Sequence, residues 1–469
     1  MRDRSGMAQA QNPRRPGINI FDDTKPMWRI FLVFLIPLMI SNVLQSASQT
    51  FSFIFLGRML GVDALAAVSA VFPVVFLLFS FLIGIASGST VLIGQAFGAG
   101  DQHRVKKIAG TVLGATLLFA IFVSVVGTLV SPYMLTLLGT PASILKEADA
   151  YTRVVFLTAP VIFPYLVFTT FLRGTGDSKT PLWFLIVSTV LTILFTPALI
   201  RGWFGLPQLG VVSAAVAGLL SQGIAFAAML VMLSRTKHPL RFDAEMARDM
   251  LFDPKILWLV VRIGVPTGLQ VIMVSLAEIA VISFVNRFGA NATAAYGAVN
   301  QIISYVQFPA ISISIAASIF GAQCIGARRE DKLGSVVRSA VMLNYIIGGI
   351  LIAICYIFAD VLIGWFITDP ATIQVAHGLL VITLWSYLLF GNSAVISGVM
   401  RSSGTVLWPT INGIFAIWAV EVPAAFILMQ HYGLRGVWMG YPISYAFVLC
   451  AQFTYYKLVW QKKTHARLV

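Results

Sequence analysis

The sequence is poor in charged residues, and most of the charge that it carries is positive. Only 11% of its 469 residues are charged, whereas 58% are hydrophobic. Soluble domains carry about 25% charged residues, so this balance excludes that class and indicates a polytopic helical membrane protein. The net charge of +14 does not indicate a nucleic-acid partner, because the basic residues stand in short clusters between apolar runs. That arrangement is typical of the cytosolic loops of membrane proteins.

Cysteine and histidine are also scarce. Cys324, Cys355 and Cys450 lie in apolar sequence without paired spacing, and the five histidines fall in loops or at the ends of apolar runs. Neither a disulfide framework nor a metal site is indicated. The chain has no GxSxG, no HExxH and no pair of aspartates within an apolar run. We therefore predict that it is not an enzyme and that it needs no cofactor.

Twelve apolar runs are long enough to cross a bilayer as helices. They lie near 28–56, 65–96, 107–131, 147–172, 180–200, 208–233, 256–286, 293–325, 334–359, 373–400, 407–430 and 435–458. The predicted organisation is a cytosolic N-terminal tail (1–27), a first lobe of six helices (28–233), a cytosolic loop (234–255), a second lobe of six helices (256–460) and a cytosolic C-terminal tail (461–469).

Lysine and arginine are distributed unevenly over the predicted loops. Of the 32 basic residues, 26 fall on the side of the two tails and 6 on the opposite side. Those on the opposite side are Arg58, Lys146, Arg153, Arg201, Arg287 and Arg435. Because basic loops stay in the cytosol, we predict cytosolic termini and a multi-pass protein of the plasma membrane, which in a bacterium is the inner membrane.

The two predicted lobes repeat one another in sequence. At an offset of 228 residues, GQAFGAGD (94–101) aligns with AQCIGARR (322–329), and Arg173 aligns with Arg401. At an offset of 229, Pro37 aligns with Pro266. Each half has an even number of spans, so the two copies run in the same direction. The expected fold is thus all-α, with twelve transmembrane helices in two lobes related by a parallel pseudo-two-fold repeat.

The most informative single residue is Glu278, which lies inside the seventh span. At 1.5 Å per residue it is roughly 24 Å from Arg262 and roughly 13 Å from Arg287. A carboxylate at that depth costs on the order of 3 kcal/mol. It either serves as a protonated hydrogen-bonding group between helices or forms a cation site. We favour the cation site.

Several ordered segments resemble one known family. They are IPLMISNVLQ, FLGRMLGVDALAAVSAVFP, GQAFGAGD, LRGTGDSKTP and LGVVSAA in the first half, and VPTGLQ, FGANATAAYGAVNQI and RGVWMG in the second. Together they resemble the multidrug and toxic compound extrusion (MATE) family of secondary transporters. The resemblance implies twelve helices in two lobes and export of amphipathic cations in exchange for Na⁺ or H⁺.

The chain departs from the family pattern at its acidic positions. Ser52 stands where many prokaryotic members carry an Asp in the first helix, and Thr196 stands where many carry an Asp before the proline of the fifth helix. The first lobe therefore keeps only neutral polar groups there, namely Gln45, Ser52, Thr192 and Thr196. In the second lobe Glu278 matches the family's seventh-helix Glu. The position of the family's tenth-helix Asp is occupied by Phe390 in this sequence, and Asn392 is the nearest polar residue.

Other polar residues inside the spans complete the candidate site. Glu421 is the second deep acid, and it could serve only to satisfy backbone freed by Pro423. Neutral polar or aromatic residues recur on the eighth span, and each could equally serve helix packing. They are Asn300, Gln301, Ser304, Tyr305 and Gln307. Tyr305 is the first choice among the aromatic residues for holding a lipophilic cation.

These features predict a cation-coupled antiporter that exports amphipathic, mostly cationic compounds, with Glu278 as the coupling carboxylate. A single carboxyl group suffices for H⁺, whereas Na⁺ prefers several oxygen ligands, so H⁺ is favoured and Na⁺ is the alternative. We expect a monomer in contact with membrane lipids. The rival function is a flippase for lipids or lipid-linked oligosaccharides. That function would need cationic side chains in the cavity, and the sequence places none deep in a span.

Overall fold

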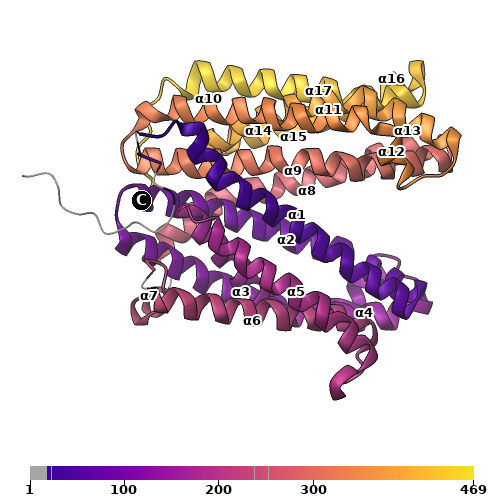
Figure 1. The fold of residues 1–469 in the computed structure, drawn as a ribbon, viewed down its shortest axis with the longest axis horizontal. Coiled ribbons are helices and arrows are strands. Elements are labelled where there is room, and N and C mark those ends of the chain that lie inside the picture. Colours follow the sequence, from indigo (N-terminus) through magenta and orange to yellow (C-terminus); the bar gives the residue numbers. More distant parts are fainter. Residues whose placement is uncertain (1–17, 19, 23, 237, 252) are drawn as a thin grey trace, which may run out of the picture.

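The computed structural model describes residues 18, 20–22, 24–236, 238–251 and 253–469. These residues form helices and connecting turns and contain no strand. Figure 1 shows the helices as two bundles that lie side by side. The predicted all-α fold is confirmed. Most of the predicted N-terminal tail (1–27) lies outside the described residues.

The first bundle, the N-lobe, contains six long helices joined by short turns. Their bounds are α1 (Met27–Leu60), α2 (Val62–Gly98), α3 (Gln102–Leu137), α4 (Ala142–Gly174), α5 (Lys179–Arg201) and α6 (Ser213–Arg235), with the one-turn elements η1 (Trp203–Gly205) and η2 (Gly210–Val212) before α6. A short helix, α7 (Ala244–Asp249), follows in the segment that joins the lobes. Its N-terminus is capped by Asp243, whose carboxylate accepts from the Met246 N–H.

The second bundle, the C-lobe, has the same plan with more interruptions. It contains α8 (Pro254–Asn286), α9 (Ala290–Gly326), η3 (Glu330–Lys332), α10 (Leu333–Leu343), η4 (Asn344–Gly348), α11 (Gly349–Ile357), α12 (Ala359–Gly364), α13 (Pro370–Thr383), η5 (Leu384–Ser386), α14 (Tyr387–Ser402), α15 (Leu407–Phe415), η6 (Ala416–Glu421), α16 (Val422–Tyr432), α17 (Leu434–Tyr455) and η7 (Tyr456–Trp460). The π-helical elements η4, η6 and η7 continue neighbouring helices, so pairs such as α15 and α16 form one span.

Eleven helical segments of the described residues are long and apolar enough to cross a membrane. The twelfth predicted span corresponds to α17 and η7, where Gly436, Gly440 and Pro442 lower the apolar content. The observed helix ends lie within about six residues of the predicted ones. The largest differences are at α3, which begins at Gln102 and ends at Leu137 where the apolar run predicts 107 and 131. α3 begins before its apolar run because Asp101 caps its N-terminus by accepting from the Arg104 N–H, and the polar first turn is also helical.

The internal repeat is visible in the backbone as well as in the sequence. Gly61 precedes α2 and Gly289 precedes α9, and both have φ near +91°. Gly176 and Gly404 take φ of +86° and +80° after the helices α4 and α14. Glycine adopts this left-handed region without steric cost. The same turn therefore recurs at equivalent places in the two lobes.

The first helix of each lobe crosses to the other lobe at one end. Phe31 and Phe34 of α1 pack into a C-lobe core with Phe320 of α9, and the Phe31 and Phe320 rings are 4.9 Å apart. In the reverse direction, Val260 and Ile263 of α8 pack into the main N-lobe core. The two bundles are therefore joined through buried apolar contacts at this end.

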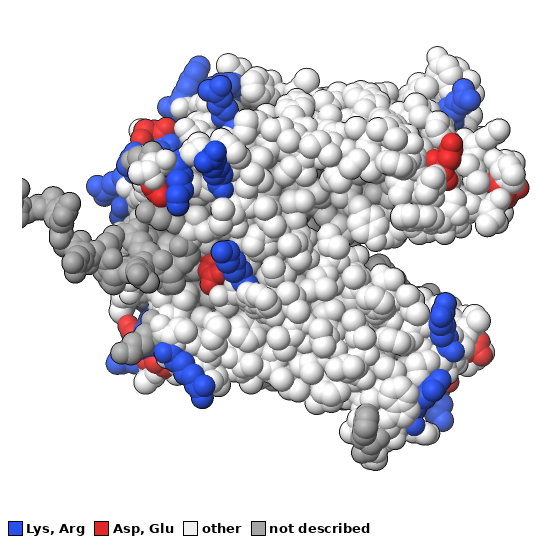
Figure 2. Space-filling view, viewed as in Figure 1, with Lys and Arg blue, Asp and Glu red and all other residues white. Residues whose placement is uncertain are grey.

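The lobes separate at the opposite end. Figure 2 shows a deep cleft between them that opens at the right of the view, whereas the lobes are in contact at the left. Most of the visible Lys and Arg residues lie at the closed end. The closed end also holds the start of α1 and the C-terminus, as Figure 1 shows.

The C-terminal tail runs across the closed end. The Leu468 N–H donates to Oε1 of Gln95 at 2.8 Å, and Leu468 and Val469 pack against the main N-lobe core. Trp460, in the C-lobe, donates from Nε1 to Ser403 Oγ at 2.9 Å and stacks on His465. The tail thus contacts both lobes.

Candidate functional site: a cleft between two lobes

The foot of the cleft is closed by side-chain amides and by small residues. Gln95 of α2 donates from Nε2 to the Ser402 carbonyl at 2.8 Å. Gln323 of α9 donates from Nε2 to the Gly174 carbonyl at 2.9 Å. Each glutamine belongs to one lobe and its acceptor to the other, so the closed end has two symmetry-related hydrogen bonds across the interface.

Glycines allow the helices to approach closely at this end. A Cβ atom on Gly98 would collide with the Gln323 backbone, and one on Gly326 would collide with the Gln95 backbone. Further along, Gly84 of α2 lies directly against Gly264 of α8. Close helix approach through small residues is the usual way to pack helices in a membrane.

The two deep acids of the C-lobe lie close together. Glu278 of α8 and Glu421 of η6 are near enough for their charges to interact, although they are far apart in sequence. Glu421 is 5% exposed, whereas Glu278 is exposed. Neither acid forms a salt bridge within the described residues, since the ion pairs found there involve other acids.

Four tyrosines surround these acids, and the sequence interpretation did not assign them to the site. Tyr296 and Tyr441 join α9 to α17 through their hydroxyl groups, which are 3.0 Å apart. Tyr387 and Tyr445 stack edge to face with ring centroids 5.2 Å apart. All four interact electrostatically with Glu421. We call these six residues the acid–tyrosine cluster: Glu278, Glu421, Tyr296, Tyr387, Tyr441 and Tyr445.

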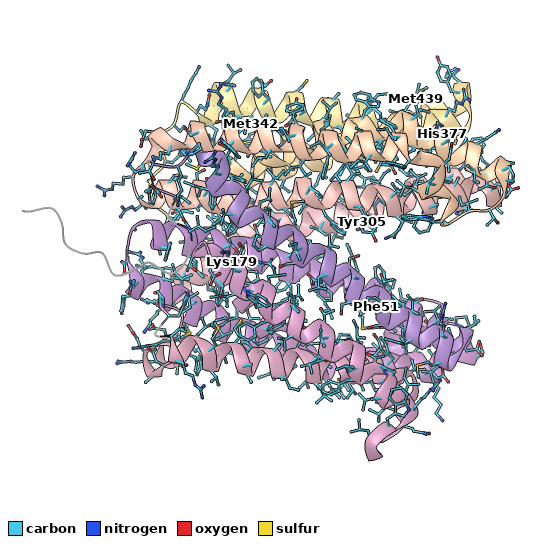
Figure 3. All side chains as sticks on the ribbon, in the orientation of Figure 1. Phe51, Lys179, Tyr305, Met342, His377 and Met439 are labelled. Atoms are coloured by element: carbon cyan, nitrogen blue, oxygen red, sulfur yellow. The ribbon has the colours of Figure 1, made fainter. Side chains whose placement is uncertain are left out.

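The polar residues predicted on the eighth span differ in their surroundings. Asn300 lies within hydrogen-bonding reach of Tyr296 and so borders the acid–tyrosine cluster. Ser304 donates to the Asn300 carbonyl of its own helix at 2.9 Å. Gln307 is half-buried and Gln301 is exposed. Tyr305 is 50% exposed. Figure 3 shows Tyr305 and Phe51 on opposite sides of the cleft.

The N-lobe has its own cavity of about 240 Å³ near the open end, and it is lined by neutral groups. Ser52 of α1 and Thr192 of α5 line it together with Gln49, Tyr151 and Gln222. Thr196 is fully buried and donates to the Thr192 carbonyl of its own helix. Ser52 and Thr192 thus share a cavity, while Thr196 is not among the residues that line it.

A second cavity of about 240 Å³ lies between the lobes near the closed end. It is lined from the N-lobe by residues of α1, α2 and α4 and from the C-lobe by residues of α9 and α14, with Gln45 among them. Arg173 and Arg401, at equivalent positions of the repeat, both line it. The sequence interpretation found no cationic side chain deep in a span and did not foresee these two in the cavity. Both arginines stand at the ends of their spans, and only the closure of the lobes places them inside.

No metal site is indicated in the part of the chain that the structure describes. Its His, Cys, Asp and Glu residues form no group of three or more that could hold an ion. The acid–tyrosine cluster contains two carboxyl groups and therefore falls short of such a group. The cysteines are unpaired, with Cys324 and Cys355 buried and Cys450 exposed.

Comparison with known proteins identifies the family. The MatE family model matches the chain twice, over residues 37–198 and 266–427. The chain belongs to the MATE family of membrane transporters. The two matches begin at Pro37 and Pro266, so the MATE model recognises the same repeat that the sequence shows.

Relatives and solved structures agree with the MATE assignment. The chain is 51% identical to "Probable multidrug resistance protein YoeA" of Bacillus subtilis, over 95% of this chain and 97% of that protein. It is 28% identical to "Probable multidrug resistance protein NorM" of Thermotoga maritima, over 86% and 87%. The crystal structure of a point mutant of the Vibrio cholerae MATE transporter VcmN has a TM-score of 0.86 at 19% identity, over 93% of this chain and 97% of that chain.

Phe390, where the family resemblance predicts the tenth-helix Asp position, makes an aromatic contact in this MATE chain. Phe390 packs with its ring centroid 5.4 Å from that of Tyr445, beside the acid–tyrosine cluster. Asn392, the nearest polar residue in sequence, is 5% exposed and accepts at Oδ1 from Asn344 Nδ2 at 3.0 Å. Asn392 therefore joins α14 to the π-helical turn η4.

Proposed function

We propose that this MATE transporter exports amphipathic, mostly cationic compounds in exchange for an inward-moving cation, and that Glu278 couples the two movements. The observation that carries the proposal is the proximity of Glu278 and Glu421 in the C-lobe, without a basic partner among the described residues. Two acids in such a place attract a cation, whether an ion or the charged group of a substrate. The names of the relatives, which are probable multidrug resistance proteins, support export of drugs.

The open end of the cleft faces the outside in this proposal. The closed end carries most of the basic residues visible in Figure 2, and basic loops remain in the cytosol. The structure then corresponds to an outward-open state.

The proposed cycle uses Glu278 in both states. With the cleft open to the outside, the exposed carboxylate takes up an external cation and releases the exported compound. With the cleft open to the cytosol, Glu278 gives up that cation and pairs with the next compound. Moving one charge across 100 mV provides about 2.3 kcal/mol, which supports roughly a fifty-fold gradient of a neutral compound. One coupled cation is therefore enough to drive export of a neutral compound. Export of a monovalent cationic compound by one-for-one exchange moves no net charge and depends on the concentration gradient of the coupled ion.

We propose H⁺ as the coupled ion. Glu421 brings a second carboxyl group beside Glu278. Two neighbouring acids, of which Glu421 is buried, disfavour double ionisation, so the pair readily holds a proton. Na⁺ would need several oxygen ligands. The two carboxylates could supply some of them, and tyrosine hydroxyls and backbone carbonyls would have to supply the rest.

The test is efflux of a fluorescent lipophilic cation from vesicles that contain the purified transporter. In Na⁺-free buffer, an opposing proton gradient is expected to drive the dye, and its collapse is expected to stop the movement. Glu278→Gln keeps the side-chain shape but cannot cycle a charge, so it is expected to lose transport. Glu330→Gln, at an exposed acid outside the spans, is the matched control and is expected to transport normally.

Two results would contradict the proposal. Normal dye efflux by correctly folded Glu278→Gln would remove the coupling role of this residue. Transport driven by a Na⁺ gradient at symmetric pH, with none driven by a proton gradient, would overturn the choice of ion.

A further inference from the structure

Two arginines from opposite lobes face one cavity, and no acid among the described residues pairs with them. Arg173 of α4 and Arg401 of α14 both line the cavity near the closed end of the cleft. Neither forms a salt bridge in the described part of the chain. Arg401 Nη1 is 3.4 Å from Ser87 Oγ, and its buried Nε has no hydrogen-bond partner among the described residues. The cavity therefore holds two positive charges and an unsatisfied donor.

Such an arrangement favours a bound anion. Buried charges are normally paired, because removing a charge from water without a partner is costly. The planar guanidinium presents several N–H donors in a geometry that matches carboxylate and phosphate oxygens. The hydroxyl group of Ser318 also lines the cavity and can donate to the same oxygens. Thr90 and Thr169 line it as well, but their hydroxyl groups donate to the Ala86 and Leu166 carbonyls of their own helices at 2.6 Å.

We infer that this cavity binds the carboxylate or phosphate group of a molecule with an apolar body, held between Arg173 and Arg401. The remaining walls are largely apolar and include Phe79, Leu82 and Ile319. A cavity of about 150 Å³ accommodates benzene, so about 240 Å³ suits a compact aromatic or aliphatic acid. The group could belong to a free organic anion or to the head of a membrane lipid.

The binding site depends on the conformation, because its two arginines belong to different lobes. Arg173 belongs to the N-lobe and Arg401 belongs to the C-lobe, and Figure 2 shows the lobes in contact at this end of the cleft and apart at the other. An anion between them interacts with both lobes only while this end is closed. The anion therefore binds more tightly when this end is closed, and its binding stabilises the closed-end state relative to a state in which the lobes have separated at this end.

Calorimetric titration of the purified transporter in lipid nanodiscs tests this site. The probe is 2-naphthoate, with the neutral 2-naphthamide as its isostere, in discs of phosphatidylcholine alone. Wild type is expected to bind naphthoate more tightly than naphthamide, and the preference is expected to fall as salt is raised. Arg173→Gln and Arg401→Gln are each expected to weaken naphthoate binding by about tenfold or more. The double variant is expected to lose the preference for the anion.

Three matched variants make the result specific. Arg235→Gln removes an exposed arginine from the end of α6 and is expected to bind as wild type does. The double variant R173K/R401K keeps both charges and is expected to retain the preference for naphthoate, with reduced affinity. Glu278→Gln is expected to bind naphthoate normally. Its result separates this site from the proposed coupling carboxylate, and the titration requires no ion gradient.

A second series identifies the source of the anionic group. Discs containing phosphatidylglycerol compete with naphthoate in wild type, but not in the double Gln variant, if a lipid head enters the cavity. If phosphatidylglycerol has no effect while naphthoate still binds through both arginines, the ligand is a free organic anion. Equal affinity for naphthoate and naphthamide in wild type would overturn the site, as would unchanged naphthoate binding by the folded double Gln variant.

Discussion

Gln95 and Gln323 stand at equivalent positions of the two repeats, and each donates its side-chain N–H to a carbonyl of the opposite lobe. Gln95 donates to Ser402 at 2.8 Å and Gln323 donates to Gly174 at 2.9 Å. The two acceptors are themselves equivalent in the repeat. This reciprocal pair fastens the closed end of the cleft, so its removal should change the balance between outward-open and inward-open states.

Loss of either glutamine is expected to favour separation of the lobes at the closed end. A net hydrogen bond contributes about 1 kcal/mol, so Gln95→Ala or Gln323→Ala should shift the ratio of the two states about fivefold. Spin labels on cysteines at Lys146 and Arg435, on opposite lobes at the open end, would measure this ratio through the distance distribution. Gln102→Ala, at an exposed position, is the control. Identical distributions in all variants would show that the pair does not set the balance.

Glycine is required where the lobes touch most closely. Gly98→Ala and Gly326→Ala each place a methyl group against the backbone of the opposite lobe, so both variants are expected to lose the closed-end state and active transport. Gly334→Ala adds a methyl group where no atom lies within 4 Å and should behave as wild type. Vesicle dye efflux, together with the spin-label distances, measures the effect. Full transport by Gly98→Ala would mean that the helices move apart at little cost.

An acid restored to the N-lobe should be tolerated at one predicted position and rejected at the other. Ser52 lines the neutral cavity of about 240 Å³, which has space and polar neighbours for a carboxylate. Thr196 is fully buried. Ser52→Asp is therefore expected to fold with wild-type yield, whereas Thr196→Asp should lower thermal stability, since an unpaired buried charge commonly costs several kcal/mol. Size-exclusion profiles and melting curves of the purified proteins measure folding and thermal stability. Equal stability of the two variants would contradict the placement of Ser52 in a cavity and of Thr196 in a packed interior.

The orientation in the membrane can be tested with single cysteines. In a background that lacks Cys324, Cys355 and Cys450, cysteines at Lys146 and Arg435 are expected to react with an impermeant reagent added outside intact cells. A cysteine at Glu330, at the closed end, is expected to react only after the cells are opened. Labelling of the Glu330 position from outside would reverse the proposed orientation.

Lys106 fastens the segment between the lobes to α3, through ion pairs with Asp243 and Glu245 at 2.7 Å each. Burial alone would raise the pKa of Asp243. Hydrogen bonds from Lys106, Arg241 and the Met246 N–H outweigh this effect and hold that pKa below its ordinary value of 3.8. A carboxylate with a lowered pKa contributes stability above its ordinary pKa and loses that contribution as the pH falls. Hydrogen exchange in α7 should therefore be protected equally from pH 8 to 5, after correction for intrinsic rates, and become faster below about pH 4.

Replacing the lysine tests the same contact at neutral pH. Lys106→Met is expected to speed exchange in α7, because both carboxylates lose their shared partner. Lys255→Met, next to the cap of α8, serves as the control and should leave α7 unchanged. Unchanged exchange in Lys106→Met would show that α7 is held by Met246, which is fully buried, and not by the ion pairs.

The sequence by itself determined the class of protein, the spans and the repeat. Apolar runs must be buried in the bilayer as helices with all backbone groups paired, so composition and run length were enough to place the helix ends within about six residues. Equivalent positions such as Gln95 and Gln323 could be aligned with one another because the two halves of the chain share residues at a nearly constant offset. Glu278 stood out because an acid is costly at that depth.

The tertiary structure alone decided which residues meet. Glu278 and Glu421 lie far apart in the chain, and only the packing of α8, η6 and α17 brings them beside the same tyrosines. Arg173 and Arg401 read as loop-end charges in sequence, and closure of the two lobes places them around one cavity. Asn392, the polar residue nearest in sequence to Phe390, is hydrogen-bonded to Asn344 of η4, which its position along the chain did not reveal. Hydropathy and spacing report only how far a residue lies along its own helix, whereas the rotation of each helix and the angle between the lobes are fixed by side-chain packing between distant segments.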